Sequence, residues 1–156
     1  VIDLKKLGKR TIWVDCDVLQ ADGGTRTASI TGGCVAVAIS LNRLMGRGLL
    51  KDFPLRMLVA AVSAGIYQNE AILDLNYPED RDASVDFNVV MTENGEFVEL
   101  QGSGEEDVFT SEQMNAMLDL SRDGITKLVE LQKEAIIAAE KPSSGDLDGL
   151  VASFQH

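Results

Sequence analysis

The residues with the clearest capacity for chemistry are the turn Asp22-Gly23-Gly24-Thr25 and the Arg26 that follows it. Both glycines can adopt positive φ angles and let a ligand approach the backbone closely. A helix that begins near Thr25 leaves its first amide groups unpaired, and its dipole favours an anion there. Arg26 adds a guanidinium fork suited to phosphate. These residues therefore predict a phosphate site made by Gly24, Thr25 and Arg26. They also fit an ordinary helix N-cap with Arg26 on a solvated face, since the spacing of dinucleotide folds and P-loops is missing.

A second group of polar residues is acidic and comprises Asp80, Asp82 and Asp86. Asp86 begins an expected strand, and the two-residue period of a strand places it on one face with Asn88. Asp80 lies in the polar stretch 76–82, which we expect to be a loop that folds back beside Asp86. Two carboxylates at the mouth of a strand can hold a hard divalent cation, with water completing its shell. The alternative reading is a solvated acidic loop.

Longer strings around these residues resemble the ribonuclease PH family. The string from Val14 to Gly32, which contains the glycine turn, is similar to the family signature, and the resemblance extends from Val1 to about Glu140. The pattern Tyr77-x-Glu79-Asp80 followed by Val85-Asp86-x-Asn88-Val89-Val90 is similar to the family's metal-binding and catalytic segment. Pro78 departs from that pattern at a position where an acidic residue is common, outside the aspartate pair. The segment from Glu99 to Glu105 also resembles the family, but no role is assigned to it.

The resemblance implies a phosphorolytic 3′-to-5′ exoribonuclease, a nucleotidyltransferase that trims the 3′ ends of tRNA and releases nucleoside diphosphates. It implies that Gly24, Thr25 and Arg26 hold inorganic phosphate and that Asp80 and Asp86 hold Mg²⁺ or Mn²⁺. Asp86 could alternatively act as a general acid. RNA is the implied partner, and the implied assembly is a homo-oligomer, a hexamer built as a trimer of dimers. Two other classes stay open: a catalytically silent ring subunit of an exosome-like assembly, and a phosphate-binding enzyme acting on a small molecule.

The composition restricts these possibilities. The 156 residues carry a net charge of −11, which argues against a broad basic surface, so most of an RNA-binding surface must come from elsewhere. The one histidine, His156, is the last residue, which argues against histidine general-base chemistry. Cys16 and Cys34 lie in apolar segments and are expected to be reduced core residues. No apolar run reaches membrane-spanning length and no signal peptide is visible, so a cytoplasmic location without membrane contact is expected.

The pattern of apolar residues predicts an α+β fold, and the resemblance specifies a ribonuclease PH-like mixed sheet with helices packed on it. Residues 1–141 are expected to be the C-terminal, larger part of one such domain, incomplete at the N-terminus, and residues 142–156 a loosely ordered tail. Val1 to Leu7 is expected to be the last turns of a helix whose beginning is absent.

The individual elements follow from periodicity and turn residues. Expected are a strand at Thr11–Leu19, a helix at Thr25–Arg43 that is apolar nearly all round, a hairpin of strands 57–66 and 71–75, a second hairpin over 85–102 turning at Asn94-Gly95, and two helices after Thr110 separated by Asp123-Gly124.

Overall fold

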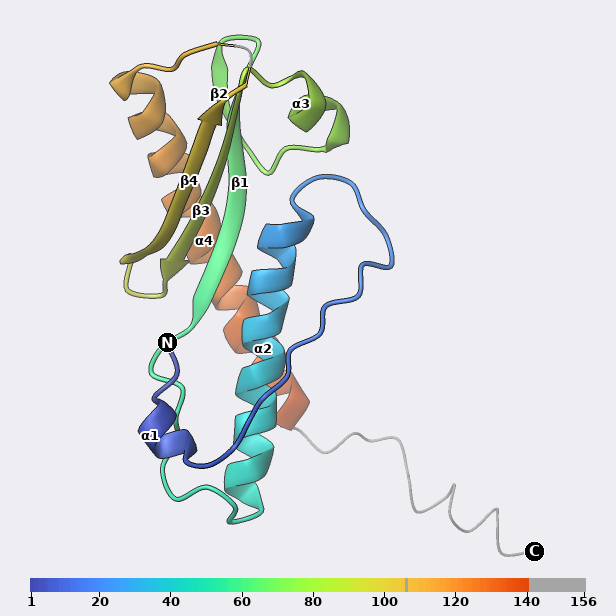
Figure 1. Cartoon of the computed structure of the whole chain (residues 1–156), viewed down its shortest axis with the longest axis vertical. Coiled ribbons are helices and arrows are strands. Elements are labelled where there is room, and N and C mark those ends of the chain that lie inside the picture. Colours follow the sequence, from blue (N-terminus) through green and yellow to red (C-terminus); the bar gives the residue numbers. More distant parts are fainter. Residues whose placement is uncertain (106, 141–156) are drawn as a thin grey trace, which may run out of the picture.

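The computed structural model describes residues 1–105 and 107–140, and it confirms the α+β class (Figure 1). Four strands form one sheet in the order β2-β1-β3-β4, with antiparallel neighbours throughout. In chain order the elements are α1 (Leu4–Leu7), α2 (Thr25–Gly46), β1 (Val59–Tyr67), β2 (Glu70–Leu73), α3 (Tyr77–Asp82), β3 (Val85–Thr92), β4 (Phe97–Gly104) and α4 (Ser111–Glu140). The expected tail at residues 142–156 lies outside the described residues.

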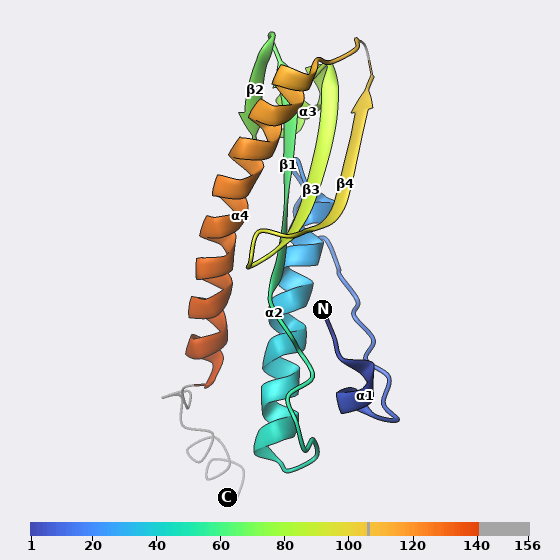
Figure 2. The ribbon, with the colours of Figure 1, turned by 90° about the vertical axis from the view of Figure 1, so that its left-hand side faces the viewer.

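The main core lies between the sheet and α4, which runs along one face of it (Figure 2). Met117, Ile125 and Val129 of α4 are buried there. Alternate residues of the two central strands meet them, namely Ala60, Val62, Ala64 and Ile66 of β1 and Val85, Phe87, Val89 and Met91 of β3. The residues between them, such as Asp86 and Asn88, must point to the opposite face because side chains alternate along a strand. The acidic candidate therefore belongs to the face away from α4.

Both predicted hairpins are present. The turn between β1 and β2 consists of Gln68 and Asn69, whose φ angles are 50° and 67°. The turn between β3 and β4 contains Asn94-Gly95, where Gly95 has φ 81°. Positive φ at such positions matches the right-handed twist of the flanking strands, which is why Asn-Gly predicts the second hairpin well.

Helix α2 begins at Thr25, as predicted, and ends at Gly46 rather than Arg43. Its buried residues are Thr27, Cys34, Ala38 and Leu41, so this helix, apolar nearly all round, is covered on only part of its surface. By length and composition α2 is long and apolar enough to cross a membrane, although no apolar run of that length was expected from the sequence. Here it packs against β1 and α4.

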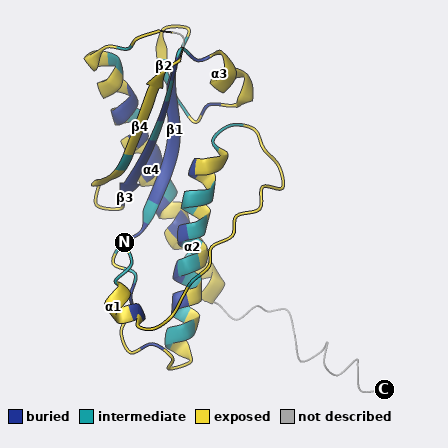
Figure 3. Cartoon of the chain, in the orientation of Figure 1, coloured by how far each residue is buried: buried dark blue, intermediate teal, exposed yellow. Residues whose placement is uncertain are grey.

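The strand predicted at Thr11–Leu19 is wrong. This segment has no regular secondary structure. It runs alongside α2 as an extended chain and is largely exposed (Figure 3). Trp13 and Leu19 are 90% and 93% exposed. A β-strand requires a neighbour to take its backbone hydrogen bonds, and no strand among the described residues lies beside it. The β-rich composition of the segment is therefore not sufficient to make it a strand.

The first residues also differ from the prediction. The helix there is the single turn α1, and Asp3 caps it by accepting from the backbone N–H groups of Lys5 and Lys6 at 3.0 and 3.3 Å. Ile2 pairs with Leu55 in an isolated β-bridge. Residues 1–7 are therefore not the last turns of a longer helix in this structure, and Gly8 is the C-cap of α1.

The stretch 76–82 is a helix, α3, and not the expected loop. Asn76 and Glu79 form a capping box, in which each side chain accepts from the other residue's backbone N–H at 3.0 and 2.9 Å. Pro78 lies in the first turn, where its missing N–H has no consequence. The Asn-x-x-Glu spacing in the sequence could have predicted this helix. Asp80 therefore lies on a short capped helix and not on a loop.

Helix α4 is continuous, although Asp123-Gly124 was expected to break it. Gly124 is buried at the point where α4 crosses the sheet. A Cβ atom there would lie 2.8 Å from a methyl carbon of Leu73 on β2. This glycine therefore serves close packing against the sheet. A capping box precedes the helix, in which Thr110 and Gln113 each accept from the other residue's backbone N–H.

Candidate functional site

The N-terminus of α2 has the properties of an anion site. Gly24 is the N-cap residue in the left-handed conformation, with φ 62°, and no side chain caps the helix. The first helical hydrogen bond is made by the N–H of Ala28, so the N–H groups of Thr25, Arg26 and Thr27 precede the helical ladder. No acidic residue lies in the first turn. The helix dipole and these amides favour a bound anion.

Gly23 fixes the position of this turn against the chain that leads into α3. A Cβ atom at Gly23 would lie 1.8 Å from the carbonyl oxygen of Leu75, which is an impossible approach. Beside it, the Asp22 carboxylate accepts from the N–H of Tyr77, the first residue of α3, at 2.7 Å. The glycine turn and the helix that carries Asp80 are therefore held together directly.

This close approach predicts that Gly23→Ala destabilises the protein by about 1–3 kcal/mol or more, because the turn must move off the Leu75 backbone. Gly32→Ala is a matched control, since a Cβ atom at Gly32 in the middle of α2 meets no atom within 4 Å. That change should stabilise the protein by roughly 0.5–1 kcal/mol through helix propensity. Urea unfolding of both variants measures the two effects, and equal stabilities would contradict the assignment of Gly23.

The structure brings Asp80 and Asp86 close enough to interact. Burial raises the pKa of the Asp86 carboxyl, and the negative charges of Asp80 and Glu105 raise it further. The amide of Asn88, on the same face of β3, donates to the Asp86 carboxylate at 3.3 Å. In the described part of the chain, no group of three or more His, Cys, Asp or Glu side chains gathers as a metal site. The acidic centre is therefore a pair of carboxylates with an amide beside it.

Arg26 extends from α2 across the sheet to β4, where one of its terminal nitrogens, Nη2, donates to both carboxylate oxygens of Glu99 at 2.8 and 2.9 Å. Both side chains are about half exposed. The sequence reading gave Glu99 no role. The pairing of β3 with β4 was a usable signal, because Glu99 pairs with Val90 and so shares a face with Asn88 and Asp86.

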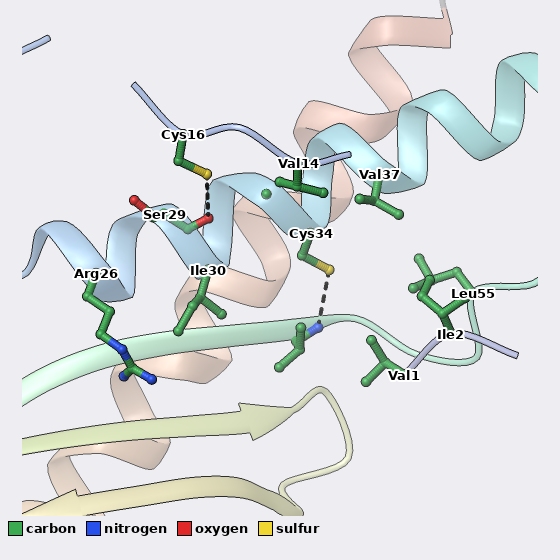
Figure 4. Close-up of a pocket in the computed structure, with 12 residues that line it drawn as sticks. Val1, Ile2, Val14, Cys16, Arg26, Ser29, Ile30, Cys34, Val37 and Leu55 are labelled. Carbon is green, nitrogen blue, oxygen red and sulfur yellow. Dashed lines mark hydrogen bonds between the residues drawn. The ribbon is translucent and has the colours of Figure 1, made fainter. Parts of the chain in front are cut away.

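Two of the cavities that border α2 lie beside the candidate site. One of about 380 Å³ lies between the extended segment and α2, and Val14, Ile30, Cys34 and Val37 contribute to its mainly apolar wall, with Arg26 at one end (Figure 4). The other, of about 410 Å³, borders the glycine turn and is lined in part by Asp22, Gly23 and Thr25. The second cavity therefore leaves open space beside the turn.

The two cysteines differ in their surroundings. Cys34 is buried, as expected, and burial raises the pKa of its thiol. Cys16 is exposed, so its expected place in the core is wrong. The cause is the same as for the wrongly predicted strand, because Cys16 lies in the segment 11–19, which pairs with no strand in the part of the chain that the structure describes.

Comparisons with known proteins agree with the resemblance seen in the sequence. Residues 57–124 match the family model described as "3' exoribonuclease family, domain 2". Ribonuclease PH of Crocosphaera subtropica is 57% identical over 138 residues, which cover 88% of this chain and 58% of the relative. Ribonuclease PH of Bacillus subtilis is 55% identical over 137 residues, 87% of this chain and 56% of the relative. The chain thus spans a little over half the length of the curated relatives that it matches.

Solved structures support the fold. The crystal structure of Rrp46 from rice (Oryza sativa) is similar with a TM-score of 0.56 at 19% identity, covering 74% of this chain and 49% of that one. An archaeal exosome core structure is similar with a TM-score of 0.57 at 23% identity, covering 74% of this chain and 47% of that one. At these identities the likeness concerns the fold alone. In sequence and in fold, this chain resembles the C-terminal, larger part of ribonuclease PH.

Proposed function

We propose that the protein containing this chain is a phosphorolytic 3′-to-5′ exoribonuclease that trims tRNA 3′ ends with inorganic phosphate and releases nucleoside diphosphates. One observation carries the proposal. The uncapped N-terminus of α2, with Arg26, is tied by Asp22 to the helix that bears Asp80, beside Asp86. An anion site and a carboxylate pair on linked elements can bring phosphate and a divalent cation together at a phosphodiester. The curated relatives named ribonuclease PH support the same assignment.

In this proposal, phosphate binds to the amides of Gly24, Thr25 and Arg26 and to the guanidinium of Arg26. The attacking oxygen is already nucleophilic, so no side chain needs to form a covalent intermediate. Catalysis then rests on positioning the phosphate next to the RNA 3′ end and on neutralising charge. A histidine base is not needed, in keeping with a chain whose one histidine is its last residue.

We further propose that Asp80 and Asp86 hold Mg²⁺ or Mn²⁺. The donors fit such an ion, because hard cations prefer carboxylate oxygens and the charge of Asp80 raises the pKa of Asp86, which a bound cation would offset. A bound divalent ion supplies charge neutralisation at the scissile phosphate. Asp86 keeps the alternative role of a general acid, for which a raised pKa is suitable.

The same proposal gives RNA and further copies of the chain, arranged as a hexamer, as partners. It also places the protein in the cytoplasm. Exposed apolar side chains support an assembly, since Trp13, Val14, Val18 and Leu19 are more than half exposed along one segment. Exposed apolar side chains gathered on one segment are typical of surfaces that another chain covers.

We therefore expect that residues 1–156 alone do not form a stable, active monomer. Sedimentation velocity and a phosphorolysis assay on the isolated chain test this expectation. A monodisperse, cooperatively melting monomer that still shortens RNA with phosphate would contradict it.

The proposed function is tested by incubating the protein with a 3′-extended tRNA in phosphate and analysing the products. Nucleoside diphosphates that appear only with phosphate support it. Binding of phosphate without product would indicate a silent ring subunit, and turnover of a small phosphorylated substrate in place of RNA would indicate the third class.

A further inference from the structure

The contact between Arg26 and Glu99 joins the proposed phosphate ligand to a carboxylate. Only Nη2 of the guanidinium reaches Glu99, and it contacts both carboxylate oxygens, at 2.8 and 2.9 Å. The Nε and Nη1 groups are thus left out of this pair. Side-chain exposures of 51% for Arg26 and 41% for Glu99 leave the pair accessible to a dissolved anion.

The strand register shows where this contact holds the guanidinium. Glu99 pairs with Val90, whereas Asp86 pairs with Ser103. Val90 and Asp86 lie on the same face of β3, four residues apart, which corresponds to about 13 Å along a strand. The contact with Glu99 therefore holds the Arg26 guanidinium near Val90 on this face of the sheet, away from Asp86.

We infer that Glu99 is a specificity-determining residue whose carboxylate competes with inorganic phosphate for the Arg26 guanidinium. This inference rests on the proposed phosphate site. Two anions that share one guanidinium repel each other, so a phosphate that binds Arg26 must displace Glu99 or bind more weakly beside it. A dianionic phosphate has the charge to displace the carboxylate, and a weakly held monoanion does not. Glu99 thereby sets a threshold for the anions that occupy the site.

The test measures the dissociation constant for inorganic phosphate by titration calorimetry, on the protein that carries this chain. Glu99→Gln keeps the size of the side chain and removes its charge. We expect this variant to bind phosphate about two- to fivefold more tightly, the range that corresponds to losing an exposed ion pair. Glu99→Asp keeps the charge on a side chain that is one carbon shorter, so its dissociation constant for phosphate should lie between those of the wild type and Glu99→Gln. This second variant provides the test if Glu99→Gln folds poorly.

A matched control is Glu96→Gln, which removes the same charge from the exposed turn before β4 and should leave phosphate binding unchanged. In an Arg26→Ala background, Glu99→Gln should bring no tightening, because the competed group is absent. The inference is overturned if Glu99→Gln binds phosphate equally or more weakly, or if it tightens binding equally without Arg26. Wild-type phosphate affinity in Arg26→Ala would instead contradict the proposed phosphate site itself.

Discussion

Asp86→Asn is expected to lower phosphorolytic turnover by roughly 10²–10⁴-fold, the range found when a group that acts in the transition state is lost. Asp86 lies on the face of β3 away from α4, where burial and the charge of Asp80 raise its pKa. Asparagine has nearly the same shape but neither binds a divalent cation strongly nor donates a carboxyl proton. Single-turnover rates at varied Mg²⁺ measure the effect, and Asp80→Asn should shift the metal titration in the same direction.

Asp82→Asn is the matched control for this prediction. The same change of aspartate to asparagine can be made at Asp82 on α3. Its carboxylate is exposed and accepts from Nε of its neighbour Arg81 at 2.7 Å. Exposed pairs of this kind contribute about 0–1 kcal/mol, so turnover and stability should change little. A normal rate for Asp86→Asn at limiting Mg²⁺ would exclude the metal model, whereas an equal loss in Asp82→Asn would point to general damage of the segment.

Arg26→Ala should raise the KM for phosphate about tenfold or more, since a charge-assisted hydrogen bond contributes roughly 1.5–3 kcal/mol. RNA affinity should change much less, because Arg26 is assigned to the attacking phosphate. Arg26→Lys should give an intermediate KM, as lysine keeps the charge but loses the planar fork. Initial rates at saturating RNA and varied phosphate provide the measurement.

Arg122→Ala is the control for this arginine. Arg122 is also about half exposed and paired with one carboxylate, Asp119, but it lies on α4 and stacks over Phe97. Its loss should leave the phosphate dependence unchanged. If Arg26→Ala retains the wild-type phosphate dependence, the assignment of the turn at α2 is wrong.

The parts of the fold that the sequence predicted are those in which local chemistry decides the structure. Asn94-Gly95 specifies a tight turn, and the alternation from Val85 to Met91 separates a buried face from a polar one, so the hairpin was predictable. The start of α2 at Thr25 was predictable because the two preceding glycines end the extended chain.

Other parts depended on contacts that no local pattern contains. Thr11–Leu19 has the composition of a strand but no partner strand in the described residues. Gly124 has the local signature of a helix break, yet close packing against Leu73 keeps it inside α4. The ion pair of Arg26 with Glu99 joins residues from a helix and an edge strand that only the sheet order brings together.

The most direct test of the account is the identity of the mononucleotide released from a 3′-extended tRNA by the protein that carries this chain. The account predicts nucleoside diphosphates, formed in inorganic phosphate with Mg²⁺ and absent when sulfate replaces phosphate. Nucleoside monophosphates formed at the same rate with and without phosphate would show hydrolysis instead, and would contradict a phosphate site at the N-terminus of α2.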